Sequence, residues 1–199
     1  MPKSAFGILM LCSASLLVGG CAVTPQITNT SRSSIEQELL VSSLERGFKT
    51  LDIQRFNGAT VTVDFYGLTP DKDFAKEYLI AWLQAHQVNI VTDPKEAQLR
   101  VKVFAPVLGV DQAQSFIGTP AFTVPFLGVT IPEVALFRDV KHSGHTALES
   151  FTIDEDSGKF LDKSPTAVGR SEYDDYTVLI VIHFSRSDVE QRKWDLGAF

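Results

Sequence analysis

The feature that most constrains this chain is an apolar N-terminus that ends in a cysteine. Lys3 supplies a positive charge, residues 5–18 form an apolar run, and small residues then lead into Cys21. The run is too short to span a bilayer as a stable helix, and this arrangement is typical of a secretory signal peptide. We predict that residues 1–20 are a signal peptide. Removing 20 of the 199 residues leaves 179, which is enough for one domain with a sizeable core.

The motif Val18-Gly19-Gly20-Cys21 resembles the lipobox of bacterial lipoproteins. The resemblance implies that Cys21 is lipidated and becomes the first residue of the mature chain. Ala22 follows, whereas aspartate at that place resembles an inner-membrane retention signal. The resemblance therefore implies an outer-membrane lipid anchor on the periplasmic face. Two alternatives remain: an ordinary secretory signal, which would leave a soluble protein, and a retained transmembrane anchor.

The charge and cysteine content exclude several classes of partner and cofactor. Lys3 is the only charged residue among the first 20, so the mature chain carries 17 basic and 24 acidic residues, a net charge of −7. An acidic chain is a poor match for nucleic acid or for a polybasic contact with anionic lipids. Cys12 lies in the leader and Cys21 would carry lipid. We therefore predict no disulfide, no cysteine-ligated metal and no cofactor.

The mature chain divides into a short tether and one domain. Residues 21–33 hold the lipidated cysteine and a polar, flexible tether, and residues 34–199 are predicted to form a single globular domain. Apolar residues at helical spacing predict a helix over residues 34–51, and a second helix follows Thr69-Pro70-Asp71. Its predicted buried stripe is Phe74, Tyr78, Trp82 and Ala85.

The remaining segments read as strands. Alternating residues predict strands around 61–65 and 99–103, and a short apolar run predicts another at 88–91. Residues 134–141 and 146–153 flank a predicted hairpin turn at 142–145, and residues 177–184 predict a central strand buried on both faces. A short helix is predicted after Ser187. The predicted fold class is α+β: a mixed, mainly antiparallel sheet with two amphipathic helices packed on one face and C-terminal β-hairpins.

Several motifs resemble a family of uncharacterised envelope lipoproteins of this size. They are the Ser-rich entry to the first helix, Asn57-Gly58, Ile131-Pro132-Glu133, Asp156-Ser157-Gly158 and Gly169-Arg170-Ser171. This resemblance transfers no functional residues, because the family has no established activity. The order of elements is also similar to that of small α/β domains such as the curli secretion lipoprotein, which is an analogy of fold alone.

The strongest candidate site is residues 112–132, a stretch with no Asp, Glu, Lys, Arg or His. Its prolines are incompatible with a transmembrane helix. One interpretation is an exposed interaction loop that contacts a partner, a lipid or a second copy; the other is a lid folded over the core. The candidate interaction residues are Phe116, Ile117, Phe122, Val124, Phe126 and Leu127.

Polar clusters offer weaker candidates. We predict no metal site from His142, His145 and His183. The first two flank a predicted turn, where polar residues are expected, and the third lies in a predicted core strand, where a neutral histidine is the usual case. Residues 154–158 look like a shortened calcium loop but lack its remaining donors, so a solvated turn is the better interpretation. Asp174 and Asp175 form a carboxylate pair that could do acid–base work. No known catalytic motif occurs, so we predict no catalytic residue and no enzyme.

The sequence therefore predicts an outer-membrane lipoprotein that acts by binding or scaffolding in an envelope complex. Its expected partners are the membrane, through the lipid on Cys21, and either an envelope protein or a second copy. The alternative is a periplasmic hydrolase that uses the Asp174 and Asp175 pair or the region of His142 and His145.

Overall fold

The computed structural model describes residues 32–189. Contacts divide the chain into residues 1–33 and a compact unit of residues 34–199, and only the second unit is described further. The predicted signal peptide, Cys21 and nearly all of the tether lie outside the described residues. The short helix predicted after Ser187 falls largely outside them as well.

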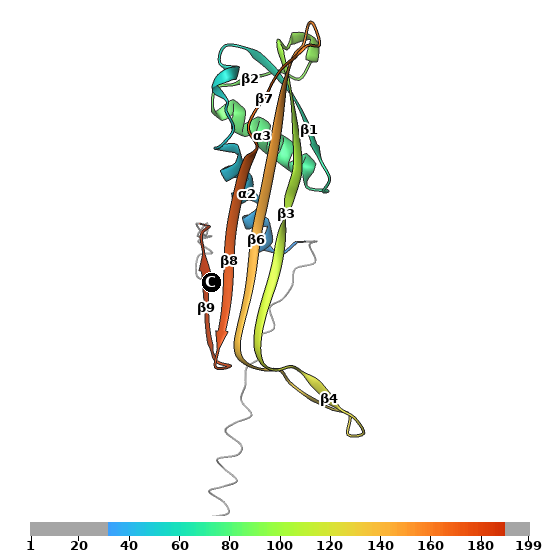
Figure 1. Ribbon diagram of the computed structural model, residues 1–199, viewed down its shortest axis with the longest axis vertical. Coiled ribbons are helices and arrows are strands. Elements are labelled where there is room, and N and C mark those ends of the chain that lie inside the picture. Colours follow the sequence, from blue (N-terminus) through green and yellow to red (C-terminus); the bar gives the residue numbers. More distant parts are fainter. Residues whose placement is uncertain (1–31, 190–199) are drawn as a thin grey trace, which may run out of the picture. The chain divides into compact units, whose positions relative to one another are not determined.

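The described part of the chain is built around one seven-stranded sheet (Figure 1). The strands run in the order β2-β1-β3-β6-β8-β9, and β7 pairs with β6. β1 pairs parallel with β2 and β3, and the other pairs are antiparallel. The strand bounds are β1 Thr60–Gly67, β2 Asn89–Ile90, β3 Leu99–Thr119, β6 Val134–Asp154, β7 Phe160–Lys163, β8 Ala167–Val178 and β9 Ile182–Ser187. A separate two-stranded sheet joins β4, Phe122–Val124, to β5, Val129–Ile131.

Two α-helices, α2 at Ser34–Phe48 and α3 at Lys72–Ala85, accompany the sheet, with two short 3₁₀ helices at Gln54–Phe56 and Pro94–Glu96. The predicted α+β class is wrong. Among the described residues 51% are in strands and 22% are helical, and the sheet curls like half a barrel. The two helices accompany only part of the sheet, because β3, β6 and β8 continue well past them (Figure 1).

The prediction failed mainly because β6 is one continuous strand of 21 residues. The predicted hairpin turn at 142–145 lies inside it, paired with both β3 and β8. Gly144, read as a turn residue, is instead needed for the approach of α2: a Cβ there would lie 2.6 Å from the Leu39 carbonyl oxygen. The glycine thus serves helix–sheet packing and not a turn.

The predicted central strand at 177–184 is also wrong. The chain turns at residues 179–181, so this apolar run is split between the end of β8 and the start of β9. β9 lies at the edge of the sheet and most of its side chains are exposed. The prediction failed for two reasons. A run dense in β-branched residues favours a buried strand, and the turn contains no Gly, Pro or Asn that would reveal it.

The α2 helix lies close to the sheet because the facing residues are small. A Cβ on Gly169 of β8 would lie 1.8 Å from the Ser43 carbonyl oxygen. The buried Ser43 and Thr146 hydroxyls are 2.8 Å apart, and the Ser171 hydroxyl donates to the Leu39 carbonyl at 2.7 Å. Such satisfied polar contacts let helix and strand backbones approach without an unpaired buried group.

The apolar core lies where α2 and α3 meet the upper part of the sheet. The buried residues of α3 are Ala75, Leu79 and Leu83. The buried stripe predicted for this helix is wrong by about one residue, because Phe74 and Ala85 are exposed. The other large core side chains are Leu40, Leu44, Phe48, Phe56, Val61, Val63, Val88, Val101, Val103, Leu108 and Leu148. No residue of β3 after position 110 belongs to this cluster.

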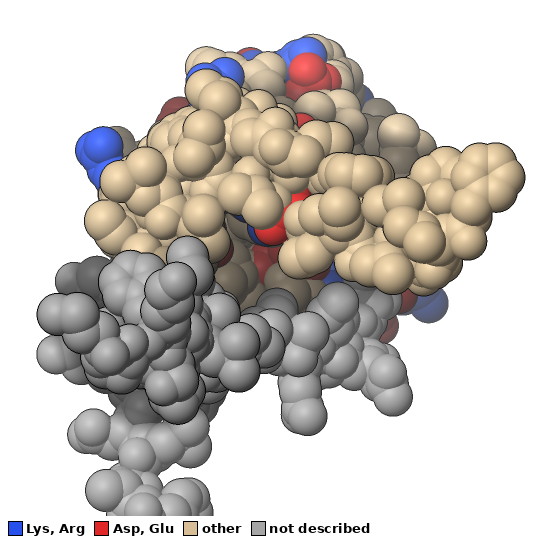
Figure 2. Space-filling model, turned by 90° about the horizontal axis from the view of Figure 1, so that it is seen from below, with Lys and Arg blue, Asp and Glu red and all other residues tan. Residues whose placement is uncertain are grey.

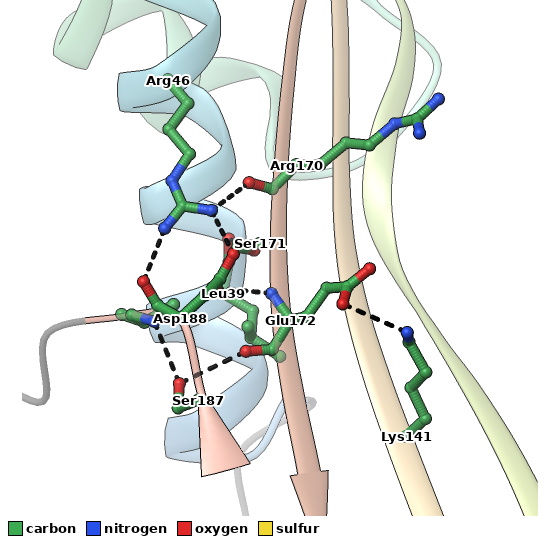
Figure 3. Close-up of polar contacts among 9 residues, drawn as sticks. Leu39, Arg46, Lys141, Arg170, Ser171, Glu172, Ser187 and Asp188 are labelled. Atoms are coloured by element: carbon green, nitrogen blue, oxygen red, sulfur yellow. Dashed lines mark hydrogen bonds and ion pairs between the residues drawn. The ribbon is translucent and has the colours of Figure 1, made fainter.

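Arg46 of α2 joins the helix to the edge of the sheet (Figure 3). Its Nη1 contacts Asp188 Oδ2 at 2.5 Å, and its Nη2 donates to the Asp188 carbonyl at 2.7 Å. The same guanidinium also donates to the Arg170 carbonyl of β8. The Glu172 backbone N–H donates to Asp188 Oδ1 at 2.8 Å. These contacts hold the end of β9 against both β8 and α2.

Candidate functional site

The end of the sheet far from the helices is rich in exposed apolar side chains. Two hairpins meet there, one from the β3–β6 pair with β4 and β5 at its tip, and one from β8 and β9 (Figure 1). In Figure 2, which views this end, most of the surface not drawn in grey belongs to uncharged residues. Lys and Arg lie mostly toward its margins, and Asp or Glu is visible in the hollow between two uncharged lobes. We call this surface the apolar end. Its exposed members are Ile117, Phe122, Phe126, Leu127, Val129, Ile131, Val134, Leu136, Leu179, Ile180, Val181, Ile182 and Phe184.

The first hairpin narrows to a finger made of β4 and β5. Val124 pairs with Val129, so residues 125–128 form its turn. At the turn, Phe126 is fully exposed (107%) and Leu127 is 73% exposed. One face of the finger carries the pair Thr123 and Thr130, whose hydroxyls are 3.1 Å apart. Because side chains alternate along a strand, the apolar residues of β4 and β5 share the other face.

A close backbone contact marks the base of the finger. The β3–β6 register shifts between Ile117 and Gly118, which indicates a bulge. A Cβ on Gly118 would lie 2.1 Å from the Val134 carbonyl oxygen. Only glycine fits such an approach, so this residue allows the finger to leave the main sheet.

The second hairpin is attached directly to the first. The Leu179 N–H donates to the Leu136 carbonyl at 2.8 Å, and the Ile180 N–H donates to the Ala135 carbonyl at 3.0 Å. The turn therefore continues the contact of β8 with β6 and places its side chains beside the base of the finger. Val181, at the turn, is 75% exposed.

Both turns hold apolar residues in a conformation that normally favours glycine or asparagine. The φ angles are 74° at Phe126, 49° at Leu179 and 72° at Ile180. Left-handed backbone costs a β-branched residue such as isoleucine roughly 1–2 kcal/mol, and such outliers concentrate at functional sites. The chain therefore places large apolar side chains at positions where a polar turn residue would give a more stable fold.

The six predicted interaction residues all lie in the extended part of the β3–β6 hairpin, and none belongs to the core cluster. Ile117, Phe122, Phe126 and Leu127 are exposed. Phe116 and Val124 are half-buried, and the Arg138 guanidinium lies 6.0 Å from the centre of the Phe116 ring. This arrangement is an exposed hairpin and does not match the alternative of a lid over the core.

Charged residues border the apolar end, and one of them lies within it. Glu133, between Ile131 and Val134, forms an ion pair with Arg138 at the base of the finger. Further up, Lys141 Nζ lies 3.2 Å from Glu172 Oε2 (Figure 3), a contact that raises the Lys141 pKa. Desolvation, reinforced by the charges of Asp174 and Asp139, raises the pKa of Tyr176 above its usual value. The apolar end is thus bounded by a polar belt.

The structure does not bring together the residues of the predicted polar sites. His142 and His145 lie three residues apart on β6 and so point to opposite faces of the sheet; His145 Nε2 is 3.9 Å from Asp111 Oδ2. His183 Nδ1 contacts the Thr177 hydroxyl at 3.0 Å on the edge strand, not in the core. Within residues 32–189, no cluster of three or more His, Cys, Asp or Glu could hold a metal ion.

The carboxylate candidates are separated in the same way. Asp174 and Asp175 are neighbours on β8, so their side chains lie on opposite faces of the sheet. In the segment 154–158, Asp154 Oδ1 accepts from both the N–H and the hydroxyl of Ser157, at 2.9 and 2.6 Å. These hydrogen bonds lower the Asp154 pKa and describe a turn, as the sequence suggested.

The sequence analysis missed the second hairpin of the apolar end. Residues 176–185 contain no Asp, Glu, Lys or Arg, and apart from His183 they show the same signal that identified residues 112–132. Reading the run as a buried strand concealed this second uncharged segment.

No family model matches the chain, and a search of curated proteins also gives no match. One solved structure to which it is similar is described as a neuraminyllactose-binding hemagglutinin homolog from Helicobacter pylori, at 11% identity and a TM-score of 0.27. The likeness covers 57% of this chain and 67% of the other. A TM-score this low carries no conclusion about fold or function. None of the helices in the described ranges is long and apolar enough to cross a membrane.

Proposed function

We propose that this protein is an envelope lipoprotein, held in the outer membrane by lipid on Cys21, and that its apolar end binds another component of the envelope. The observation that carries the proposal is the meeting of two uncharged, exposed hairpin ends at one end of the sheet. Scattered exposed apolar residues are normal, but a contiguous set bounded by charged residues is typical of an interaction surface.

The lipobox-like motif supplies the location. Cys21 follows an apolar run and small residues, and the mature chain is too acidic for a polybasic membrane contact. The anchor would therefore be covalent lipid, and two acyl chains are needed for stable attachment. The hydrolase alternative gains no support, because the two histidines of the His142 and His145 pair lie on opposite faces of the sheet, as do the two carboxylates of the Asp174 and Asp175 pair.

Two experiments test the proposal separately. Cys21→Ser should move the protein from the membrane fraction to the soluble periplasm or leave it unprocessed. An unchanged membrane fraction, without acyl labelling of the wild type, would contradict the anchor.

Crosslinking in cells tests the binding surface. Phe126→Asp should remove crosslinked products, while the lipid on Cys21 keeps the protein in the membrane fraction and the melting temperature stays near that of the wild type. Leu68→Asp is the matched control, because Leu68 is 92% exposed in the loop after β1 and outside the apolar end. Equal behaviour of the two variants would contradict the assignment of the binding surface.

A further inference from the structure

We infer that the partner of the apolar end is the lipid bilayer itself, into which the tips of both hairpins insert their side chains. This inference rests on the proposed function, because it names the partner of the same surface. It combines three observations: the direction of α2, the length of chain that precedes it, and the chemistry of the two turns.

The α2 helix begins on the side of the apolar end. Gly47, near its C-terminus, lies against Thr146 and Gly169, whereas Leu39, two turns earlier, lies against Gly144 and Ser171. β6 runs from the apolar end at Val134 upward. Going backward along α2 therefore leads toward the apolar end, and Ser34 lies further in that direction than Leu39.

The chain before Ser34 is long enough to bring the lipid anchor to the same level. Residues 22–33 separate Cys21 from α2, and twelve residues reach at most about 40 Å when fully extended. Gly144 and Leu136 are eight residues apart on β6, which is about 27 Å at the rise of an antiparallel strand. A segment of this length is therefore long enough to span from α2 to the level of the β8–β9 turn, and the finger extends beyond that level.

The tips of the two hairpins carry the side chains that an apolar medium requires. Residues 112–132 and 176–185 contain no Lys, Arg, Asp or Glu. β4 pairs antiparallel with β5, and β8 pairs antiparallel with β9, so the inward-facing backbone groups near the tips have partners. Within residues 32–189 the outer edges of β4, β5 and β9 are open, which limits insertion to the boundary between headgroups and acyl chains. The exposed turn residues are large aliphatic or aromatic side chains, which bind by burial of apolar area.

The shape favours lipid over a second protein. Phe126 and Leu127 project from a narrow tip, and Val181 projects from the neighbouring turn. A protein partner would have to supply separate pockets for both tips, whereas a fluid bilayer accommodates them without a matching surface. Tethering by Cys21 also raises the effective concentration of the bilayer at this surface.

The test uses the processed chain, residues 21–199, with Cys21→Ser so that no lipid is attached. Flotation with phosphatidylethanolamine–phosphatidylglycerol vesicles should show reversible binding of this protein. Phe126→Asp combined with Val181→Asp should weaken vesicle binding at least tenfold, while Leu68→Asp changes it less than twofold. Because the tips carry no basic residue, raising the salt from 0.1 to 0.5 M should also change binding less than twofold.

Depth-dependent quenching gives a second readout. Phe126→Trp should show blue-shifted emission with vesicles and quenching by brominated acyl chains, and Leu68→Trp should show neither. No vesicle binding by the soluble protein, together with crosslinks from Phe126 to an envelope protein, would overturn the inference and leave the proposed function intact.

Two other outcomes complete the test. Concentration-dependent self-association in sedimentation experiments, abolished by Phe126→Asp and without vesicle binding, would assign the surface to a second copy and overturn the inference. Absence of vesicle binding, crosslinks and self-association alike would overturn both the inference and the proposed binding surface.

Discussion

Replacing Ile180 with asparagine should stabilise the fold and weaken binding at the same time. Ile180 has a φ of 72° in the β8–β9 turn, and its side chain is 53% exposed. Left-handed backbone costs about 1–2 kcal/mol for a residue of this kind, and asparagine tolerates it well. Because the side chain belongs to no core cluster, little packing is lost, and we expect a net gain of about 1 kcal/mol.

The gain is measurable by thermal unfolding. For a domain of this size, 1 kcal/mol corresponds to a rise in melting temperature of about 2–4 °C. Val181→Asn is the matched control, since Val181 sits in the same turn without a positive φ and should show no such rise. Both variants should reduce vesicle binding, because both remove an apolar side chain from the apolar end.

A fall in the melting temperature of Ile180→Asn, or a rise no larger than that of Val181→Asn, would refute the reasoning about backbone strain. Unchanged vesicle binding in both variants would show that the turn side chains do not contribute to the surface.

Three further predictions follow from the described contacts. Gly169→Ala should lower the free energy of unfolding by about 1–3 kcal/mol, because a new Cβ would overpack α2 against β8; urea denaturation measures this, and unchanged stability would contradict the close approach. Burial alone would raise the Asp188 pKa, but hydrogen bonds from Arg46 and the Glu172 N–H outweigh it and lower the pKa. The stabilisation from Asp188 is therefore present above about pH 4 and lost as the pH falls further, so the melting-temperature difference between wild type and Asp188→Asn should shrink between pH 6 and pH 3. A constant difference would refute this. Zinc should not raise the melting temperature, because His142 and His145 face opposite sides; a rise that disappears in His142→Ala with His145→Ala would refute that.

Local sequence patterns correctly predicted the elements whose structure depends on residues close together in the sequence. Apolar spacing predicted α2, which begins at Ser34, and the alternation of Val61, Val63 and Phe65 predicted β1. The turn after Asp154 followed from its Asp, Ser and Gly residues. In each case the pattern and its hydrogen-bond partners lie within a few residues of sequence.

The sequence failed where distant packing decides the structure. Gly144 looks like a turn residue, yet its role depends on Leu39, more than a hundred positions earlier. Leu179 and Ile180 form a turn without any turn-type residue, because hydrogen bonds to β6 hold them there. The uncharged run at 112–132 corresponds to the extended part of the β3–β6 hairpin, but its pairing along β6 could not be predicted from composition.

β3 and β6 each run unbroken for 21 residues from the helix-covered core to the apolar end, which limits how the length of this part of the molecule can change in evolution. One added residue in a single strand would shift the register and turn every later side chain to the other face, unless a bulge such as the one between Ile117 and Gly118 takes it up. Two residues added to each strand would preserve every facing and move the tips outward by about 7 Å. Homologues should therefore differ in this region by even-numbered insertions matched on both strands, or by single insertions taken up as bulges, leaving the helix contacts of the core untouched.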